Sequence, residues 1–397
     1  MLPSALDGTR VLDLSRFVPG LFCTMLMADM GADVLAIEEP ISGPNSKAMA
    51  GPAMRSDASE EALAVQPLYR NKRRMELNLK APEGRDVFYR LCGDADVVLE
   101  GFRPGVVKRL AVDYETVKRI NPRIVYCSIT GYGQTGPYAQ LPGHDINYLA
   151  LTGISSLIGP RDGPPVIPYN FIGDYSGGTM YALSGILMAL LVREKTGQGQ
   201  YVDVAMADGA MSLMTGAMAS YFGTGQVPAR GSDLLTGGYA CYSYYQAKDG
   251  KWLALGCAES WFHANLCKAL GREDFIPDQY NDARQPEMFA FFRERLRTRT
   301  RDEWFEVLTK ADVCVSKVNT LDEVPSDPHV RHRQMITRVR TPRGAEVSQV
   351  GVPFKLSASP GAVRTTSPKR GEHTHAVLRA LGMSAGEIEG LRAKGAV

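Results

Sequence analysis

Hydrophobic and polar residues alternate along the first half of the chain in the manner of strands separated by helices. Short runs rich in β-branched residues predict buried strands, and longer stretches with a period near 3.6 predict helices. Strands and helices that alternate in this way favour an α/β fold with a doubly wound parallel sheet. The strand candidates are 10–14, 33–37, 96–99, 123–129 and 201–205. The helix candidates are 21–30, 106–120, 179–193 and 208–221.

A change in this pattern near residue 223 predicts a second, smaller α+β domain. Two strand candidates, 241–246 and 252–256, flank Asp249-Gly250, and such a turn is typical of a β-hairpin. Helical patterns follow it, and a tail over 374–391 predicts two short helices around Gly382. We therefore expect a large domain over 1–222 that is completed by 331–397. The small domain then covers 223–330, and its helix candidates are 261–270, 286–297 and 301–310.

Residues 41–66 interrupt the first half with Gly, Pro, Ser, Ala and Met and show weak periodicity. This composition predicts a surface excursion without much regular structure.

Composition narrows the class of protein. The formal net charge is +2 and the basic residues are spread along the chain, which argues against nucleic-acid binding as the main task. Seven cysteines without CxxC spacing argue against a disulfide framework or a structural zinc site, and they favour a cytoplasmic location. The N-terminus lacks a secretory pattern, and no apolar run approaches the roughly 18–20 residues of a membrane span. We expect a soluble protein with no membrane association.

The segment Gly131-Tyr132-Gly133-Gln134-Thr135-Gly136 matches the G-x-G-x-x-G pattern after a strand. A dinucleotide fingerprint also needs a helix that opens inside the motif and an acidic residue about 20 positions later. Here Pro137 follows, and the acidic residue in range, Asp162, lies in a loop-like sequence. We therefore expect no nicotinamide or flavin cofactor. The glycines fit either a close backbone approach to a ligand or a tight turn.

The densest cluster of reactive residue types is Gly143-His144-Asp145-Ile146-Asn147-Tyr148, followed by Asp174 and, much later, Glu259. Taken alone, His144-Asp145 fits the start of a helix, and Asp174 fits a carboxylate at a helix N-terminus. The six histidines have no spacing typical of metal ligands, so we expect no metal site.

Taken in order, the motifs resemble the family III CoA-transferase superfamily over nearly the whole chain. Within that superfamily, residues 143–148 are similar to the α-methylacyl-CoA racemase branch. The matching landmarks are 6–14, Asn71-Lys72-Arg73, Phe102-Arg103-Pro104-Gly105, 131–137, 196–200, 327–330 and 371–374.

The resemblance implies a role for each position in the cluster. His144 and Asp174 match the acid/base pair of the racemases, and Glu259 matches the glutamate that partners the histidine. Asp145 matches the nucleophile of the transferases. The resemblance also implies an interlocked homodimer with a Rossmann-like large domain. Coenzyme A enters as part of the substrate, without any other cofactor. The candidate CoA-binding residues are Asn71, Lys72, Arg73, Arg103, Gly131, Tyr132 and Gly133.

The favoured reaction is racemisation of a 2-substituted acyl-CoA through an enolate. Inversion needs a base on one face of the α carbon and an acid on the other, roles that histidine and a carboxylate can exchange near neutral pH. Backbone N–H groups near Gly173, Gly177 and Gly178 are expected to stabilise the enolate.

Two alternatives stay open at this point. In a CoA-transferase, Asp145 attacks the acyl-CoA and CoA recaptures the anhydride as an aspartyl thioester. In a non-catalytic acyl-CoA binder the fold is kept without turnover. The sequence leaves the acyl group open.

Overall fold

The structure is a computed structural model that describes residues 4–40 and 59–397. The excursion predicted for 41–66 lies mostly outside the described residues, and its last part contains the short helix α2 (Glu60–Ala64). The chain forms two compact units. Unit 1 contains residues 1–152, 169–214 and 328–397, and unit 2 contains 153–168 and 215–327. The boundaries drawn from the sequence differ from these, because residues 153–168 and 215–222 group with unit 2 and residues 328–330 with unit 1.

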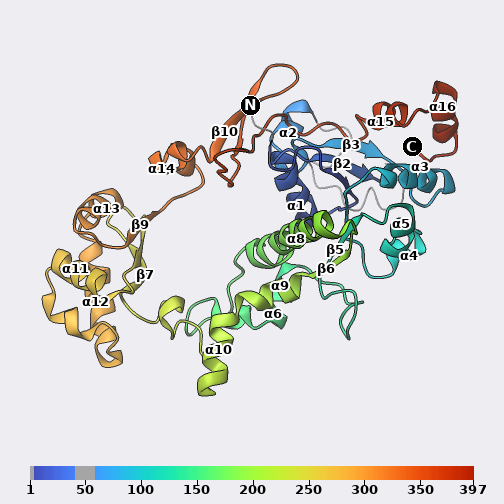
Figure 1. The fold of residues 1–397 in the computed structure, drawn as a ribbon. Helices are drawn as coiled ribbons and strands as arrows, with labels where there is room; N and C mark the ends of the chain where they lie inside the picture. The colour runs from blue at the N-terminus through green and yellow to red at the C-terminus, as the bar shows by residue number, and fades with distance from the viewer. Residues whose placement is uncertain (1–3, 41–58) are drawn as a thin grey trace. The chain divides into compact units, whose positions relative to one another are not determined.

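Unit 1 is built on a six-stranded parallel sheet with the order β3-β2-β1-β4-β5-β6 (Figure 1). This is the strand order of a Rossmann-type sheet, so the predicted doubly wound α/β fold is confirmed. The order of strands reverses between β1 and β4, where Leu12 pairs with both Leu35 and Val98. The strands are β1 (Arg10–Asp13), β2 (Asp33–Glu38), β3 (Arg73–Glu76), β4 (Val97–Glu100), β5 (Val125–Thr130) and β6 (Tyr201–Ala205).

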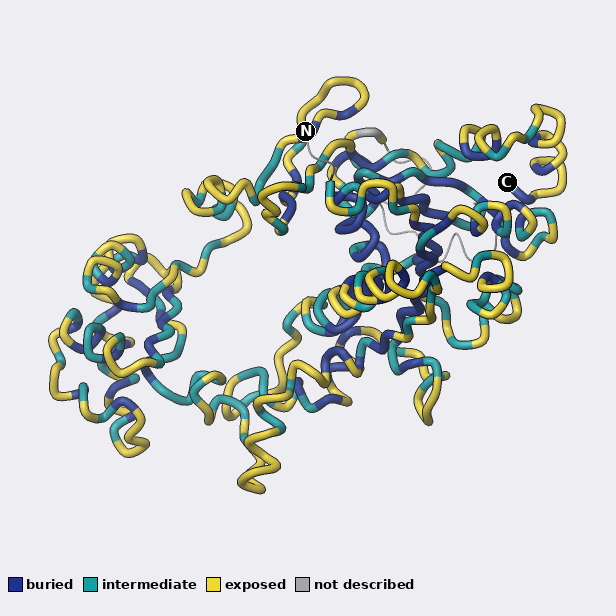
Figure 2. Tube along the Cα trace, viewed as in Figure 1, coloured by how far each residue is buried: buried dark blue, intermediate teal, exposed yellow. Residues whose placement is uncertain are grey.

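Helices cover both faces of this sheet because successive residues of each strand point to opposite sides. On one face, Leu12 packs with Phe88 of α3 and Leu378 of α15. On the other face, Val11 packs with Met27 of α1 and Ile186 of α8. β4 and β5 are buried throughout their length. Figure 2 shows much of the sheet region of unit 1 in dark blue, the colour of buried residues. The helices on these two faces are α1 (Val18–Asp29), α3 (Pro82–Gly93), α4 (Val106–Arg109), α5 (Tyr114–Ile120), α8 (Tyr181–Thr196), α15 (Thr374–Ala380) and α16 (Ala385–Ala393).

A long helical segment begins earlier than the sequence predicts. A π-helical stretch, η3 (Phe171–Met180), leads directly into α8. It crosses α9 (Met206–Leu213) at glycines: a side chain at Gly209 would lie 2.0 Å from the carbonyl oxygen of Gly177. The helix expected over 208–221 is two helices, α9 and α10 (Thr215–Thr224).

The combined segment Phe171–Thr196 has 26 residues, and its most apolar window has a mean hydropathy of 1.4. By length and composition it is able to cross a membrane, and the expectation that no apolar run is long enough is therefore wrong. One such helix is weak evidence, since a core helix of a soluble protein has the same properties. Here α8 packs on β5, β6 and α1, and Arg193 near its end pairs with Asp96 at 2.8 Å.

The last part of unit 1 returns to the start of the chain. An antiparallel hairpin, β10 (Ile336–Arg340) and β11 (Glu346–Val350), was not predicted. The buried guanidinium of Arg70 joins it to α1, since Arg70 pairs with Asp29 at 2.6 Å and donates to the carbonyl of Val350. Short helices in this unit are η2 (Pro67–Tyr69), α6 (Asp145–Leu151) and α14 (Pro328–His332).

Unit 2 contains the antiparallel sheet β7-β8-β9 and a helical layer around Trp304, Phe275 and Phe292. The predicted hairpin is present, and Gly250 in its turn has a φ of 77°. The strands are β7 (Tyr242–Gln246), β8 (Trp252–Gly256) and β9 (Val315–Val318). The helices are α7 (Ile154–Leu157), α10, η4 (Leu234–Thr236), α11 (Ser260–Leu270), η5 (Glu273–Asp278), η6 (Asp282–Arg284), α12 (Gln285–Leu296), α13 (Arg301–Lys310) and η7 (Val324–Ser326).

Candidate active site

His144 stands at the N-cap of α6, but its imidazole does not make the cap. The backbone N–H of His144 donates to Asn147 Oδ1 at 3.0 Å, and its carbonyl accepts from the Asn147 N–H at 2.8 Å. Asn147 thus holds the start of the helix. His144 is exposed, and its imidazole ring makes no capping hydrogen bond.

Asp145, the first residue of α6, joins this helix to η3. Its Oδ1 accepts hydrogen bonds from the backbone N–H groups of Gly173 at 2.7 Å and Asp174 at 2.9 Å. Gly173 has no room for a side chain, because a Cβ there would lie 2.7 Å from the same oxygen. Among the described residues, Asp145 Oδ2 is buried and has no hydrogen-bond partner. The Asp145 carboxylate therefore connects the start of α6 to the start of η3.

Asp174 lies half-buried on η3, and Asn170 Nδ2 donates to its Oδ2 at 2.9 Å. Burial raises the pKa of the Asp174 carboxyl, and the Asp145 charge raises it further. The Asn170 hydrogen bond and the nearby His144 lower this pKa. His144 and Asp174 are therefore within electrostatic reach of each other, and the structure brings His144, Asp145 and Asp174 together at one site.

Asn170 was missed by the sequence analysis. It lies four residues before Asp174, a spacing at which side chains meet on a helix. It follows Tyr169, whose φ of 58° is rare for a residue with a side chain. Backbone strain of this kind is found most often at functional sites.

The expected enolate donors near Gly173 are not supported. The Gly173 N–H is already given to Asp145. Gly177 and Gly178 are buried where η3 meets α9, and a side chain on Gly177 would lie 2.7 Å from the Met206 carbonyl oxygen. These glycines serve helix packing, which corrects the expectation.

Gly131 and Gly143 make room for the ring of Tyr148. A Cβ on Gly131 would lie 2.6 Å from that ring, and Tyr148 donates to the Gly143 carbonyl at 2.7 Å. The Tyr132 ring packs edge-on against Tyr148 at 5.1 Å. Gly133 has a φ of 88°, and its N–H is held by the hydroxyl of Thr130 at 3.0 Å. The glycine motif thus forms a fixed turn after β5, and no helix opens within it.

The buried Lys72 does not fit the CoA-binding role that the family resemblance implies. Its ammonium donates to Asp13 Oδ2 at 3.1 Å, to Thr24 Oγ1 at 2.6 Å and to the Leu21 carbonyl at 2.8 Å. A lysine has three donors, and all three are used. Burial lowers the pKa of Lys72 and the Asp13 charge raises it. The side chain belongs to the core of unit 1.

Asn71 and Arg73 are likewise engaged by the fold. The Asn71 amide donates to Asp29 at 2.8 Å and to the Ala362 carbonyl at 2.8 Å. Arg73 pairs with Asp33 at 2.7 Å. The Asn71 amide is thus used by the fold, whereas Arg73 is partly exposed in its ion pair and its role in CoA binding stays a prediction.

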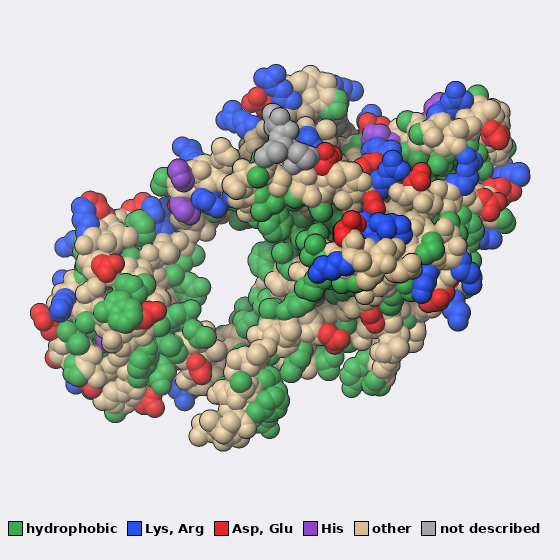
Figure 3. Space-filling model, viewed as in Figure 1, with side chains coloured by type: hydrophobic (Ala, Val, Ile, Leu, Met, Phe, Trp, Pro, Cys, Tyr) green, Lys and Arg blue, Asp and Glu red, His purple; other side chains and the backbone are tan. Residues whose placement is uncertain are grey.

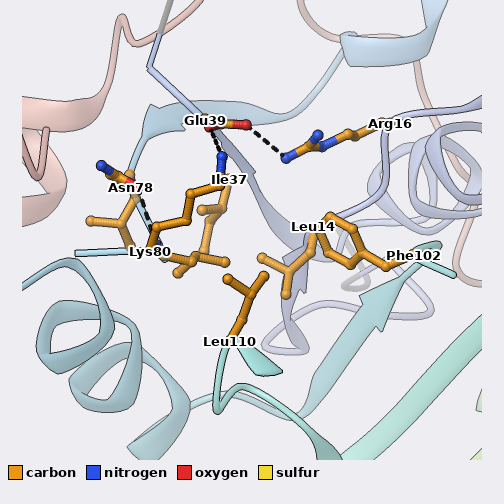
Figure 4. Close-up of a pocket in the computed structure, with 10 residues that line it drawn as sticks. Leu14, Arg16, Ile37, Glu39, Asn78, Lys80, Phe102 and Leu110 are labelled. Atoms are coloured by element: carbon orange, nitrogen blue, oxygen red, sulfur yellow. Dashed lines mark hydrogen bonds and ion pairs between the residues drawn. The ribbon is translucent and has the colours of Figure 1, made fainter. Parts of the chain in front are cut away.

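A pocket that the sequence analysis did not identify lies at the carboxyl ends of β1, β2, β3 and β4 (Figure 4). In sheets with this strand order, ligands bind at these ends, near the point where the order reverses. Arg16 and Lys80 supply positive charge, and Glu39 lies between them. Arg103 follows the lining residue Phe102 in the same loop. The pocket is lined by Leu14, Arg16, Ile37, Glu39, Leu77, Asn78, Leu79, Lys80, Phe102 and Leu110.

Glu259 lies in unit 2, at the N-cap of α11, without a side-chain capping bond. Its pairing with His144 stays a prediction. Over the described residues, no group of three or more His, Cys, Asp or Glu side chains is arranged to hold a metal ion.

Comparison with known proteins decides the family. Residues 6–374 match the model of CoA-transferase family III. The chain belongs to this family. It is 36% identical to α-methylacyl-CoA racemase of Homo sapiens over 385 residues, 97% of this chain and 95% of that protein.

CoA-transferase family III contains more than one activity among the relatives of this chain. The β subunit of succinyl-CoA–L-malate CoA-transferase of Chloroflexus aurantiacus is 34% identical, with 98% of this chain and 97% of that protein covered. A CAIB/BAIF family protein from Brucella suis has a similar structure, with a TM-score of 0.81 and 30% identity over 96% of this chain and all of that one. The chain is thus a member of an enzyme family, and racemase and transferase relatives have similar identity to it.

Proposed function

We propose that this protein is a racemase of 2-substituted acyl-CoA thioesters. The observation that carries the proposal is the proximity of His144 and Asp174: His144 precedes Asp145 in the chain, and the Asp145 carboxylate accepts the Asp174 N–H at 2.9 Å. Imidazole and a carboxyl group whose pKa is raised by burial are suited to exchanging the roles of base and acid.

In this mechanism one of the two groups removes the α proton, and the electron pair of the C–H bond moves toward the thioester oxygen to give an enolate. The other group then delivers a proton to the opposite face of the same carbon. Asn170 holds the Asp174 carboxylate in place with a hydrogen bond that favours its ionised form. The reverse reaction exchanges the roles of His144 and Asp174.

The nucleotide end of CoA would bind over the pocket at the ends of β1 to β4. Its phosphates and ribose would face Arg16 and Lys80, with Arg103 in the adjacent loop. The fixed turn at 131–133 leads from β5 toward His144 and would line the path of the thioester arm.

The remaining parts of the proposal follow the family resemblance. Glu259 would orient and stabilise the protonated His144 ring. The protein would act in the cytoplasm as an interlocked homodimer. Catalysis would need neither a metal nor a cofactor besides the CoA of the substrate. Apolar side chains are exposed along α8, with Met188 63% and Leu191 65% exposed, and they support a second copy as the partner. Figure 3 shows hydrophobic side chains gathered in the region of the molecule where Figure 1 draws α8. All seven cysteines are free, and six are buried.

A CoA-transferase is the second candidate, since transferase relatives have similar identity to this chain. For this alternative we propose Asp174 as the nucleophile in place of Asp145, the residue expected from the sequence. Asp145 is 6% exposed and its accepting oxygen is held by two N–H groups, whereas Asp174 is more open. Asp174 would attack the thioester carbonyl and break the C–S bond, giving a mixed anhydride and CoA thiolate. The thiolate would then attack the aspartyl carbonyl, so that the donor acid leaves as a carboxylate and an aspartyl thioester remains.

Isotope exchange separates the candidates. In heavy water, a 2-methylacyl-CoA incubated with the wild-type protein should gain deuterium at the α carbon and lose optical purity, and His144→Ala should abolish both. Hydroxylamine trapping at Asp174 without exchange would indicate the transferase instead. Binding of acyl-CoA with neither exchange nor trapping would leave a non-catalytic binder.

A further inference from the structure

The two cations of the pocket share one carboxylate. Glu39 Oε2 lies 3.3 Å from an Arg16 guanidinium nitrogen, and Glu39 Oε1 lies 2.5 Å from Lys80 Nζ (Figure 4). The Glu39 side chain is 12% exposed, whereas those of Arg16 and Lys80 are 32% and 50% exposed. Glu39 is thus a largely buried acid that lies between two more exposed bases.

Each of the three side chains comes from the carboxyl end of a different strand. Arg16 follows β1, Glu39 comes directly after β2 and Lys80 follows β3. The Arg16 guanidinium also lies over the Phe102 ring, 5.1 Å from its centroid, at the end of β4. The arrangement is therefore fixed by the sheet and is not confined to one loop.

An acidic residue at the end of the second strand has a known consequence in sheets of this order. There it accepts hydrogen bonds from ribose hydroxyls, and a basic residue nearby accommodates a ribose phosphate. The pocket contains both kinds of group. A phosphate carries about −1.5 to −2 charges at neutral pH, so it must displace Glu39 or lie beside it.

We infer that Glu39 determines specificity at the ribose end of the ligand: it weakens binding of the CoA 3′-phosphate, so that dephospho-CoA thioesters are accepted nearly as well as CoA thioesters. The inference rests on the proposed function, because it takes an acyl-CoA as the ligand. It goes beyond that function by assigning a discriminating role to a residue away from the reacting carbon.

The test compares two ligands that differ only in the 3′-phosphate. Binding of CoA and 3′-dephospho-CoA is measured by calorimetry, and KM is measured for the thioesters of both with the same acyl group. Glu39→Gln frees both cations, so affinity for CoA should rise about five- to tenfold, the range of about 1–1.4 kcal/mol. Affinity for dephospho-CoA should stay within about twofold.

Two further variants serve as a control outside the pocket and as a change with the opposite expected effect. Asp86→Asn removes one negative charge from the exposed face of α3, outside the pocket, and should change neither affinity. Lys80→Gln should have the opposite effect to Glu39→Gln, since CoA loses a cation for its phosphate while dephospho-CoA does not.

An equal loss of affinity for both ligands in Glu39→Gln would overturn the inference, because Glu39 would then contact a part that both share. An unchanged preference in Glu39→Gln and Lys80→Gln would overturn it as well. If the wild-type protein bound neither ligand, the proposed function itself would fail, a result distinct from binding without discrimination.

Discussion

Asp145 holds Asp174 through its backbone: Oδ1 of Asp145 accepts the Asp174 N–H at 2.9 Å. Because the same oxygen also accepts the Gly173 N–H, the start of η3 is fixed relative to α6. The distance between His144 and Asp174 thus depends on a carboxylate that need not touch the substrate.

Substitution of Asp145 should distinguish a positioning role from a nucleophilic one. Asp145→Asn keeps an oxygen in place of Oδ1, so activity should remain within about tenfold of the wild type. Asp145→Ala removes the acceptor and releases η3, and a misplacement of about 1 Å can reduce kcat about a hundredfold. Steady-state kinetics with both variants check this. Complete inactivity of Asp145→Asn, in a protein that unfolds at the wild-type temperature, would instead favour Asp145 as a nucleophile.

Removal of the Asn170 amide should change the pH profile. The Asn170 hydrogen bond lowers the pKa of Asp174, so Asn170→Ala should raise that pKa further. Activity that needs ionised Asp174 is lost as pH falls through this pKa, and the acid limb should therefore move to higher pH. The check is kcat against pH, with Asn170→Ser as the variant that can keep a short donor. A uniform loss at every pH would assign Asn170 a purely structural role.

Substitution of Lys72 should lower the stability of the fold, whereas substitution of Lys80 should weaken acyl-CoA binding. Lys72→Met leaves the fully buried Asp13 carboxylate without its ion-pair partner, which should cost about 3–5 kcal/mol of unfolding free energy. Lys80 is half exposed, so Lys80→Gln should leave unfolding nearly unchanged and raise KM for an acyl-CoA. Urea unfolding and KM of both variants provide the measurement. A Lys72→Met protein of normal stability with a raised KM would restore the phosphate role expected from the sequence.

The sequence predicts the strands of the sheet well where runs of apolar residues mark segments that are buried on both faces. The runs around Val11, Val34, Val98 and Val125 are β-branched because both faces of a parallel sheet are covered. The strand β3 was missed since it is an edge strand with the sequence Arg-Arg-Met-Glu, whose charges find partners only in the folded chain. Its Arg73 pairs with Asp33 and its Arg74 with Glu38, contacts that no local pattern encodes.

The candidate site was predictable only in part, for a related reason. His144 and Asp174 stand out as residue types beside glycines. Asn170 and Glu39 do not, because their significance depends on which side chains the fold brings near them. The CoA-binding role of Lys72 is implied by the family resemblance alone, and no local pattern indicates that its ammonium meets Asp13, a carboxylate 59 positions away.

Glu100 provides a prediction about stability and pH. This glutamate ends β4, and its Oε2 accepts the Phe102 N–H at 2.7 Å. Burial raises the pKa of the carboxyl to about 7. The folded chain therefore holds a proton that the unfolded chain releases above about pH 4.3.

Between these two pKa values the native state binds more protons than the unfolded state, so this group makes stability fall as pH rises from about 4.3 to about 7. Above that range the penalty is complete, on the order of 3 kcal/mol. Glu100→Gln keeps an acceptor for the Phe102 N–H and cannot ionise. Its unfolding free energy should exceed that of the wild type at about pH 8 and approach it at about pH 4. Urea unfolding of both proteins across this range checks the sign, and a pH-independent difference between them would show that the fold does not raise the pKa of Glu100.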